Sequence, residues 1–155
     1  MWWKIIVFVV LGLTVIVAVT LVYGSRRWQV ATKALQTMLE ASRLPISPTT
    51  YDARELHSLP APVQRYFRAA LEDGQPIVSA IRVEHTGTFN LSETGEHWRP
   101  FTSTQYVTTK RPGFVWDARI ALMPAVAVRV HDAYVAGQGL LQAKLIGPVP
   151  LGAPT

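Results

Sequence analysis

The sequence of 155 residues contains no cysteine, which excludes disulfides, thiolate metal ligands, thiol redox chemistry and a lipid-modified N-terminal cysteine. It also contains no Gly-x-Ser-x-Gly, His-Glu-x-x-His or Walker-type phosphate-binding motif. Gly137-Gln138-Gly139 lacks the third glycine of a dinucleotide site and is typical of a hairpin turn. The histidines that a zinc site would need, at 85, 97 and 131, lie on separate predicted elements with no carboxylate cluster beside them. We therefore expect no metal, no cofactor and no recognisable catalytic signature.

The sequence does contain one long uncharged run, from Ile5 to Tyr23. Nineteen helical residues extend about 28 Å, close to the hydrocarbon thickness of a bilayer. The polar residues of the run, Thr14 and Thr20, can return their hydroxyls to carbonyl groups one turn earlier. Aromatic residues flank both ends, as they do in membrane anchors: Trp2, Trp3, Tyr23 and Trp28. The run predicts a membrane-spanning helix with the bilayer as its partner.

Two other interpretations of this run fit less well. A signal peptide has an apolar region of about 7–15 residues followed by a small-x-small cleavage site, and residues 21–27 offer no such site. A buried helix that is apolar on every face needs a larger core than a domain of this size provides. We expect an uncleaved single-pass anchor, and the basic residues after the run slightly favour a cytoplasmic C-terminal region.

The net charge of +5 is concentrated near the anchor. Residues 1–45 contain five basic residues and Glu40, whereas residues 46–155 contain ten basic and nine acidic residues. The basic segment would meet anionic lipid headgroups. The nearly neutral remainder lacks the basic patch of a nucleic-acid-binding domain, so we expect no nucleic-acid partner.

The chain divides into three predicted parts: a transmembrane anchor with its flanks (residues 1–27), an amphipathic helical connector (28–45) and a partial α+β sheet domain (46–155). In the connector, Val30, Leu35, Met38 and Leu39 supply the apolar positions. It either continues the membrane helix or lies along the membrane surface. Two prolines, Pro45 and Pro48, break the helix and set the domain boundary.

The sheet domain begins with helical signals and continues as strands. Thr49-x-x-Asp52 indicates a short turn, and a helix over 63–74 has an apolar stripe that predicts packing on a sheet (Val63, Tyr66, Phe67, Ala70 and Leu71). Five strand patterns follow with no helix between them, at 79–91, 101–109, 114–122, 125–135 and 140–146. Gly87 interrupts the first pattern and predicts a bulge or a bend, and Met123-Pro124 ends the third strand. The predicted fold is α+β, with an amphipathic helix on an antiparallel, curved and incomplete half-barrel-like meander.

Several residues of this sheet are candidates for ligand contact. Asp117 and Arg119 share one face of a strand, opposite Trp116, and would form a polar contact or a solvated pair. Asp132 continues an apolar face that leads to Tyr134, so it needs a partner, such as Tyr134 or Arg119. Four aromatic residues at strand positions would be core or would line the concave side of the sheet: Trp98, Phe101, Phe114 and Trp116. A structural role remains open for each of these residues.

Four motifs occur in order along the chain: Leu59-Pro60-x-Pro62-Val63-x-Arg65-Tyr66, Trp98-x-Pro100-Phe101-Thr102-x-x-Gln105, Pro112-Gly113-Phe114-Val115-Trp116-Asp117-Ala118 and Asp132-x-Tyr134-x-x-Gly137-x-Gly139. Together they resemble an uncharacterised bacterial family, a domain of unknown function in membrane-anchored proteins. That family is distantly similar in outline to the half-barrel lipoprotein carriers of the LolA/LolB kind. The resemblance implies the inner membrane as location. It also implies about a hundred further residues, so we expect a truncated reading frame or a fragment.

These observations favour a membrane-anchored binding module for a lipid or another apolar ligand at the bacterial envelope, and not an enzyme. Two alternatives stay open. One is the N-terminal fragment of a tethered enzyme whose catalytic residues lie in a missing C-terminal half. The other is an interaction domain at the membrane surface.

Overall fold

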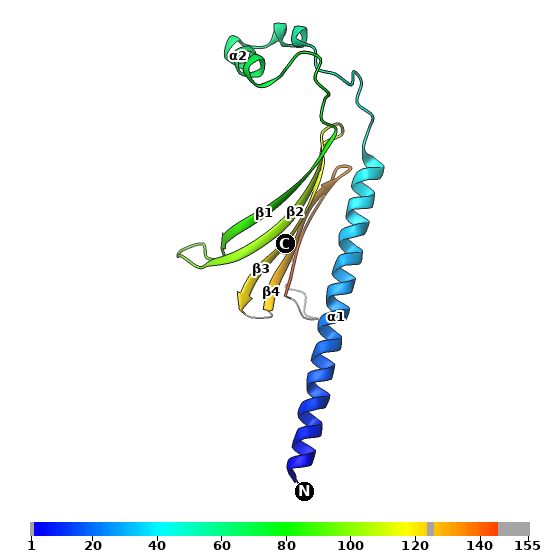
Figure 1. Cartoon of the computed structure of the whole chain (residues 1–155), viewed down its shortest axis with the longest axis vertical. Helices are drawn as coiled ribbons and strands as arrows, with labels where there is room; N and C mark the ends of the chain where they lie inside the picture. Colours follow the sequence, from blue (N-terminus) through cyan, green and yellow to red (C-terminus); the bar gives the residue numbers. More distant parts are fainter. Residues whose placement is uncertain (1, 124–125, 146–155) are drawn as a thin grey trace.

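The computed structural model describes residues 2–123 and 126–145 as one long helix followed by an open antiparallel sheet (Figure 1). This arrangement confirms the predicted α+β fold class. Three predictions or segments lie outside the described residues: the strand end expected at Pro124, the last residue of the strand expected to end at Ile146, and the C-terminal segment 147–155.

Helix α1 (Trp2–Ser42) joins the predicted anchor and the predicted connector without a break. Its most apolar window of 18 residues has a mean hydropathy of 3.2 and no buried residue, so α1 is a candidate membrane span by length and composition. Thr14 and Thr20 donate hydrogen bonds to the carbonyl oxygens of Val10 and Ile16, at 2.9 and 2.7 Å, as predicted. The apolar half of α1 therefore leaves neither hydroxyl unpaired.

The second half of α1 lies against the sheet through Trp28, Thr32 and Leu39, which are buried. Leu39 packs in a small core with Val115, Ala133 and Val135, and Leu35 and Tyr106 lie at its border. The predicted apolar stripe of the connector was partly wrong, because Val30 and Met38 are more than half exposed. A tryptophan and a threonine take the places facing the sheet because they meet polar groups there.

The five strands are β1 (Ala80–Asn90), β2 (Trp98–Thr108), β3 (Gly113–Met123), β4 (Val126–Val135) and β5 (Gln138–Leu145). They pair in sequence order, all antiparallel, which confirms the predicted meander. The bulge predicted at Gly87 was wrong, because β1 pairs continuously through Gly87 and Phe101. A side chain at Gly87 would meet the Phe101 ring at 3.2 Å, so glycine makes room for a neighbour. The register shift lies instead between Ala121 and Met123.

Alternation along the strands gives the sheet two different faces. Val115, Asp117 and His131 face α1, and with their strand neighbours they define the helix side. The other face, here called the open face, carries Phe101, Phe114, Trp116, Ile120, Val128, Val130 and Leu141.

The short helices η1 (Ala53–Ser58) and α2 (Ala61–Ala70) lie beyond one end of the sheet and over neither face (Figure 1). The prediction that the helix with the apolar stripe packs on the sheet was therefore wrong. Helix α2 has no buried residue and its contacts are with η1. The physical reason is that backbone hydrogen bonds join the two ends of this segment, from Tyr51 to Gln75, Gly74 to Tyr51 and Ile77 to Thr49. The segment thus closes on itself beyond the end of the sheet, and α1 instead of α2 packs against the sheet.

We expect Gly113→Ala to destabilise the contact between α1 and the sheet by about 1–3 kcal/mol. A β-carbon at this position would lie 2.8 Å from the Cδ1 atom of Leu39 and 2.8 Å from the backbone oxygen of Tyr134. Thermal unfolding of the full chain in detergent measures the effect. Gly139→Ala is the matched control, because a β-carbon there meets nothing within 4 Å. Equal unfolding midpoints for the two variants would contradict the close approach at Gly113.

Candidate functional site

A buried polar cluster joins α1 to the sheet, and we call it the clasp: Trp28, Thr32, Asp117 and His131. The indole Nε1–H of Trp28 donates to Oδ1 of Asp117 at 2.9 Å, and the Thr32 hydroxyl lies 3.0 Å from Oδ2. The Trp28 ring stacks on the His131 ring with centroids 3.7 Å apart. Trp28 and Thr32 are one helical turn apart, so both reach the same two strands. The clasp fixes the helix and the sheet to each other through directional contacts.

His131 is fully buried at the centre of the clasp. Its Nε2 atom lies 2.7 Å from the Thr32 hydroxyl oxygen, and we assign the proton to Nε2 because the hydroxyl then donates to Asp117. Its Nδ1 atom is buried without a hydrogen-bond partner among the described residues. Burial lowers the pKa of His131; Asp117 opposes this shift, and Lys144 and Arg129 add to it. The clasp therefore holds a neutral histidine.

The helix side of the sheet carries most of the charge on the strands. Arg82, Glu84, Asp117, Arg119, Arg129 and Lys144 lie on this side by strand register. The open face has Arg99 at one corner and Asp132 near its centre as its charged strand residues. Two faces of one sheet thus differ sharply in chemistry.

The open face is mostly apolar on β3, β4 and β5, and no described helix covers it (Figure 1). On β1 and β2 it also carries the polar residues His85, Ser103 and Gln105. Ile120 and Ala118 are nevertheless 2% and 1% exposed, because neighbouring side chains on this face close around them. Phe89 and Phe101 pack edge to face there, with ring centroids 6.1 Å apart. Leu141 on the edge strand β5 is 55% exposed. The face offers an apolar surface across several strands.

The residues predicted from the sequence to contact a ligand lie on different faces of the sheet. Phe101, Trp116, Asp132 and Tyr134 share the open face. Asp117 and Arg119 lie on the helix side. The predicted pairing of Asp132 with Arg119 was therefore wrong, because the two residues are on opposite faces. Trp98, 55% exposed at the start of β2, does not share the open face with the other aromatic residues.

Sequence reasoning identified Asp117 but missed its partners. The sequence predicts Trp28 as an aromatic residue at the membrane interface, and it assigns no role to Thr32. The available signal was their spacing of four, which places both on one helix face with Leu35 and Leu39. His131 had been considered only as a metal ligand. Among residues 2–123 and 126–145, no three His, Asp or Glu side chains come together as a metal site.

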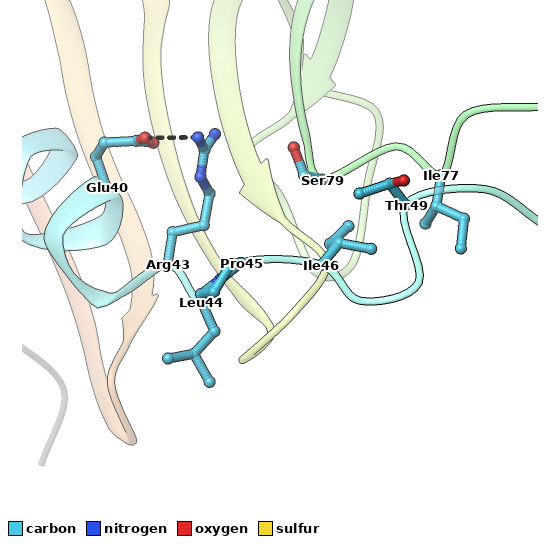
Figure 2. Close-up of a pocket in the computed structure, with 8 residues that line it drawn as sticks. All are labelled: Glu40, Arg43, Leu44, Pro45, Ile46, Thr49, Ile77 and Ser79. Atoms are coloured by element: carbon cyan, nitrogen blue, oxygen red, sulfur yellow. Dashed lines mark ion pairs between the residues drawn. The ribbon is translucent and has the colours of Figure 1, made fainter.

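A hollow lies at the end of α1, where the chain leads into the sheet domain (Figure 2). An ion pair of 3.1 Å between Glu40 and Arg43 borders it on one side, and the side chains of Ile46 and Ile77 lie on the other. Both charges of the pair are exposed, so the pair adds little to stability. This hollow has neither a buried polar group nor a deep apolar floor, and we assign it no function.

The fold and the two faces define a class: an open antiparallel sheet domain clasped to a candidate membrane anchor. Residues 57–154 match a family of unknown function, DUF6920, and the chain belongs to this family. The matched region contains α2 and all five strands, including Asp117 and His131, but only the last two residues of η1 and none of α1 with Trp28 and Thr32. No curated protein and no solved structure matches the chain.

Proposed function

We propose that this protein is a membrane-tethered module whose open face binds an acyl chain of a lipid or another elongated apolar ligand. The proposal places the chain in the inner membrane of a bacterium as a single-pass protein. It treats the sheet as a binding surface and assigns no chemical step to it.

The first support is the continuity of α1. The apolar half of the helix contains no buried residue, and the clasp begins five residues after Tyr23, about 7.5 Å along the helix axis. Because the helix does not break between these points, a bilayer around the apolar half of α1 would hold the sheet at a fixed distance from its surface. A ligand released from the membrane would meet the sheet directly.

The observation that carries the proposal is the difference between the two sheet faces. An isolated domain whose two faces are both solvated would show charges on both. Here the charges gather on the helix side, whereas the open face presents aliphatic and aromatic side chains with no described cover. Exposed apolar surfaces of this extent mark interaction sites.

The direction of the strands supports a ligand that arrives from the bilayer. Going from Trp28 to Leu39, away from the apolar half of α1, the contacts on β3 move from Asp117 back to Gly113. The other end of β3 and the start of β4 therefore point toward the membrane. Residues 120–128 contain no charge, so the membrane-facing end of the open face is apolar.

The test uses two adjacent leucines on β5 that face opposite sides. We expect Leu141→Glu, on the open face, to reduce the amount of co-purifying lipid per full-length chain about tenfold, because the carboxylate must be desolvated beside an acyl chain. Leu140→Glu is the matched control on the helix side, where lipid retention should stay within about twofold of the original protein. Both leucines are at least 40% exposed, but Leu141 pairs with Asp132, so Leu141→Glu sets two carboxylates opposite each other. Thermal unfolding of both variants therefore accompanies the lipid measurement and shows whether the sheet is intact.

Lipid per chain is measured by native mass spectrometry after purification in maltoside detergent. No retained lipid in the unsubstituted protein would reject the proposal. Equal losses in the two variants would also reject it, because the open face would then have no special role. Retention of a second protein on the open face, lost only in Leu141→Glu, would replace the lipid with a protein partner.

A further inference from the structure

Three basic residues form a row across neighbouring strands on the helix side. Arg119 on β3 pairs in register with Arg129 on β4, and Arg129 pairs with Lys144 on β5. Side chains at directly opposed positions of antiparallel strands have β-carbons about 4.5–5.5 Å apart. The row therefore places three positive charges side by side.

Like charges at opposed strand positions are destabilising unless something neutralises them. None of the ion pairs among the described residues includes a member of this row. The Nε atom of Arg129 is buried and has no hydrogen-bond partner among those residues. The nearest carboxylate along β3, Asp117, already accepts hydrogen bonds from Trp28 and Thr32. Lys144 lies over the Trp28 ring, 5.8 Å from its centroid, but none of the three charges is neutralised by a carboxylate among the described residues.

The position of the row relative to α1 identifies the anion. Arg119 is two residues closer to the membrane-facing end of β3 than Asp117, a shift of at most about 7 Å. Asp117 itself lies level with Trp28, about 7.5 Å beyond the end of the apolar run. The row consequently falls within the headgroup layer, which is about 5–8 Å thick on each side of the hydrocarbon.

We propose that Arg119, Arg129 and Lys144 bind the phosphate of an anionic lipid headgroup at the bilayer surface. The two guanidinium groups match phosphate oxygens in a forked geometry, and the ammonium group adds a compact charge. Arg119 and Arg129 line a cleft of about 420 Å³ in which Thr102 and Thr104 supply further polar side chains. Two carboxylates, Glu84 and Asp117, also line the cleft. Glu84 is paired with Arg82, and Asp117 accepts the hydrogen bonds of the clasp.

This site is on the opposite face from the proposed acyl-binding surface. Either site can fail without the other, although both rest on α1 crossing the membrane. The headgroup site adds a function that the tether alone does not supply: it sets the tilt of the sheet on the membrane and makes that tilt depend on anionic lipid.

The experiment compares two lipids with the same acyl chains, dioleoyl phosphatidylglycerol and dioleoyl phosphatidylcholine. Full-length protein in maltoside detergent is mixed with equal amounts of both, and native mass spectrometry counts each lipid bound. We expect the phosphatidylglycerol preference to fall about thirtyfold in the double variant Arg119→Gln/Arg129→Gln, because each basic residue near an anionic surface contributes about fivefold.

The matched control is Arg65→Gln/Arg68→Gln on α2, which removes the same charge from two exposed positions away from the sheet. Its phosphatidylglycerol preference should equal that of the unsubstituted protein. Thermal unfolding of each sample shows whether the sheet is intact, and Arg119→Gln/Arg129→Gln should unfold no earlier, since it relieves repulsion. An unchanged preference in that variant, or an equal loss in the control, would overturn the proposal.

Discussion

Replacing Trp28 with alanine should lower the free energy of unfolding of the full chain by about 3–5 kcal/mol, the usual loss for a buried tryptophan. Trp28 is 5% exposed, stacks on His131 and donates to Asp117. Its removal leaves a cavity, leaves Oδ1 of Asp117 without its donor and exposes His131 to water. Thermal unfolding in detergent measures the loss, and hydrogen exchange of residues 30–42 shows whether α1 has separated from the sheet.

Two further variants isolate the cause of that loss. Trp28→Phe keeps an aromatic ring over His131 but removes the N–H donor, so we expect a cost of about 1–2 kcal/mol. Tyr66→Ala removes another large aromatic side chain, but one that is 68% exposed on α2, and it should cost less than about 0.5 kcal/mol. If Trp28→Ala were no more destabilising than Tyr66→Ala, the clasp would not hold α1 to the sheet.

The sequence predicted the elements of this fold well because their signals are local. Strict alternation such as Phe114, Trp116, Ala118 and Ile120 on one face identifies a strand without knowledge of its neighbours. The absence of helical segments between strands then leaves a meander as the natural topology. The apolar run of α1 is equally local, since no residue within it is buried.

The packing of the helices was not predictable in the same way. The apolar stripe of α2 is regular, yet Tyr66 is exposed because backbone hydrogen bonds around Tyr51 hold that segment beyond the sheet. The helix that does cover the sheet uses Trp28 and Thr32, which pair with residues 85 to 99 positions later in the chain. No local pattern encodes such a pairing.

The same distinction applies to the candidate sites. Strand alternation correctly put Asp117 and Arg119 on one face of their strand, opposite Trp116. It does not fix how neighbouring strands align, so it wrongly offered Arg119 as a partner for Asp132. The row of Arg119, Arg129 and Lys144 depends on the register between three strands, including a shift near Ala121. Register follows from turn geometry and from contacts with α1, so the row emerges only in the folded chain.

The clasp thus fixes which face of the sheet lies against α1, and that face carries most of the charged strand residues. Because α1 covers the centre of one face, most of the charged strand residues share that face with the helix, and the other face is mostly apolar. Any change that loosens the clasp should disturb both proposed sites together. The protonation of His131 is such a change.

Lowering the pH from 7.5 to 5 should weaken the contact between α1 and the sheet. Burial lowers the pKa of His131 below its ordinary value of 6.5, and Lys144 and Arg129 lower it further, whereas Asp117 raises it. Above pH 6.5 the histidine is neutral in both folded and unfolded chains, so the full stability is present. As the pH falls through 6.5 toward the folded pKa, only the unfolded chain takes up the proton, and folding becomes less favourable.

The measurement is the thermal unfolding midpoint of the full chain between pH 7.5 and 5 at constant salt, compared with His131→Gln. The amide can still donate to Thr32 but does not titrate, so the variant should lose less stability over this range than the original protein. His57, His85 and His97 are present in both proteins and cancel in the comparison. Hydrogen bonds from Arg54 lower the pKa of Asp52 to about 2, so the stability linked to that carboxylate disappears only below this range. Parallel pH profiles for the two proteins would show that the proton does not act at His131, and the clasp would then be a fixed joint without a pH response.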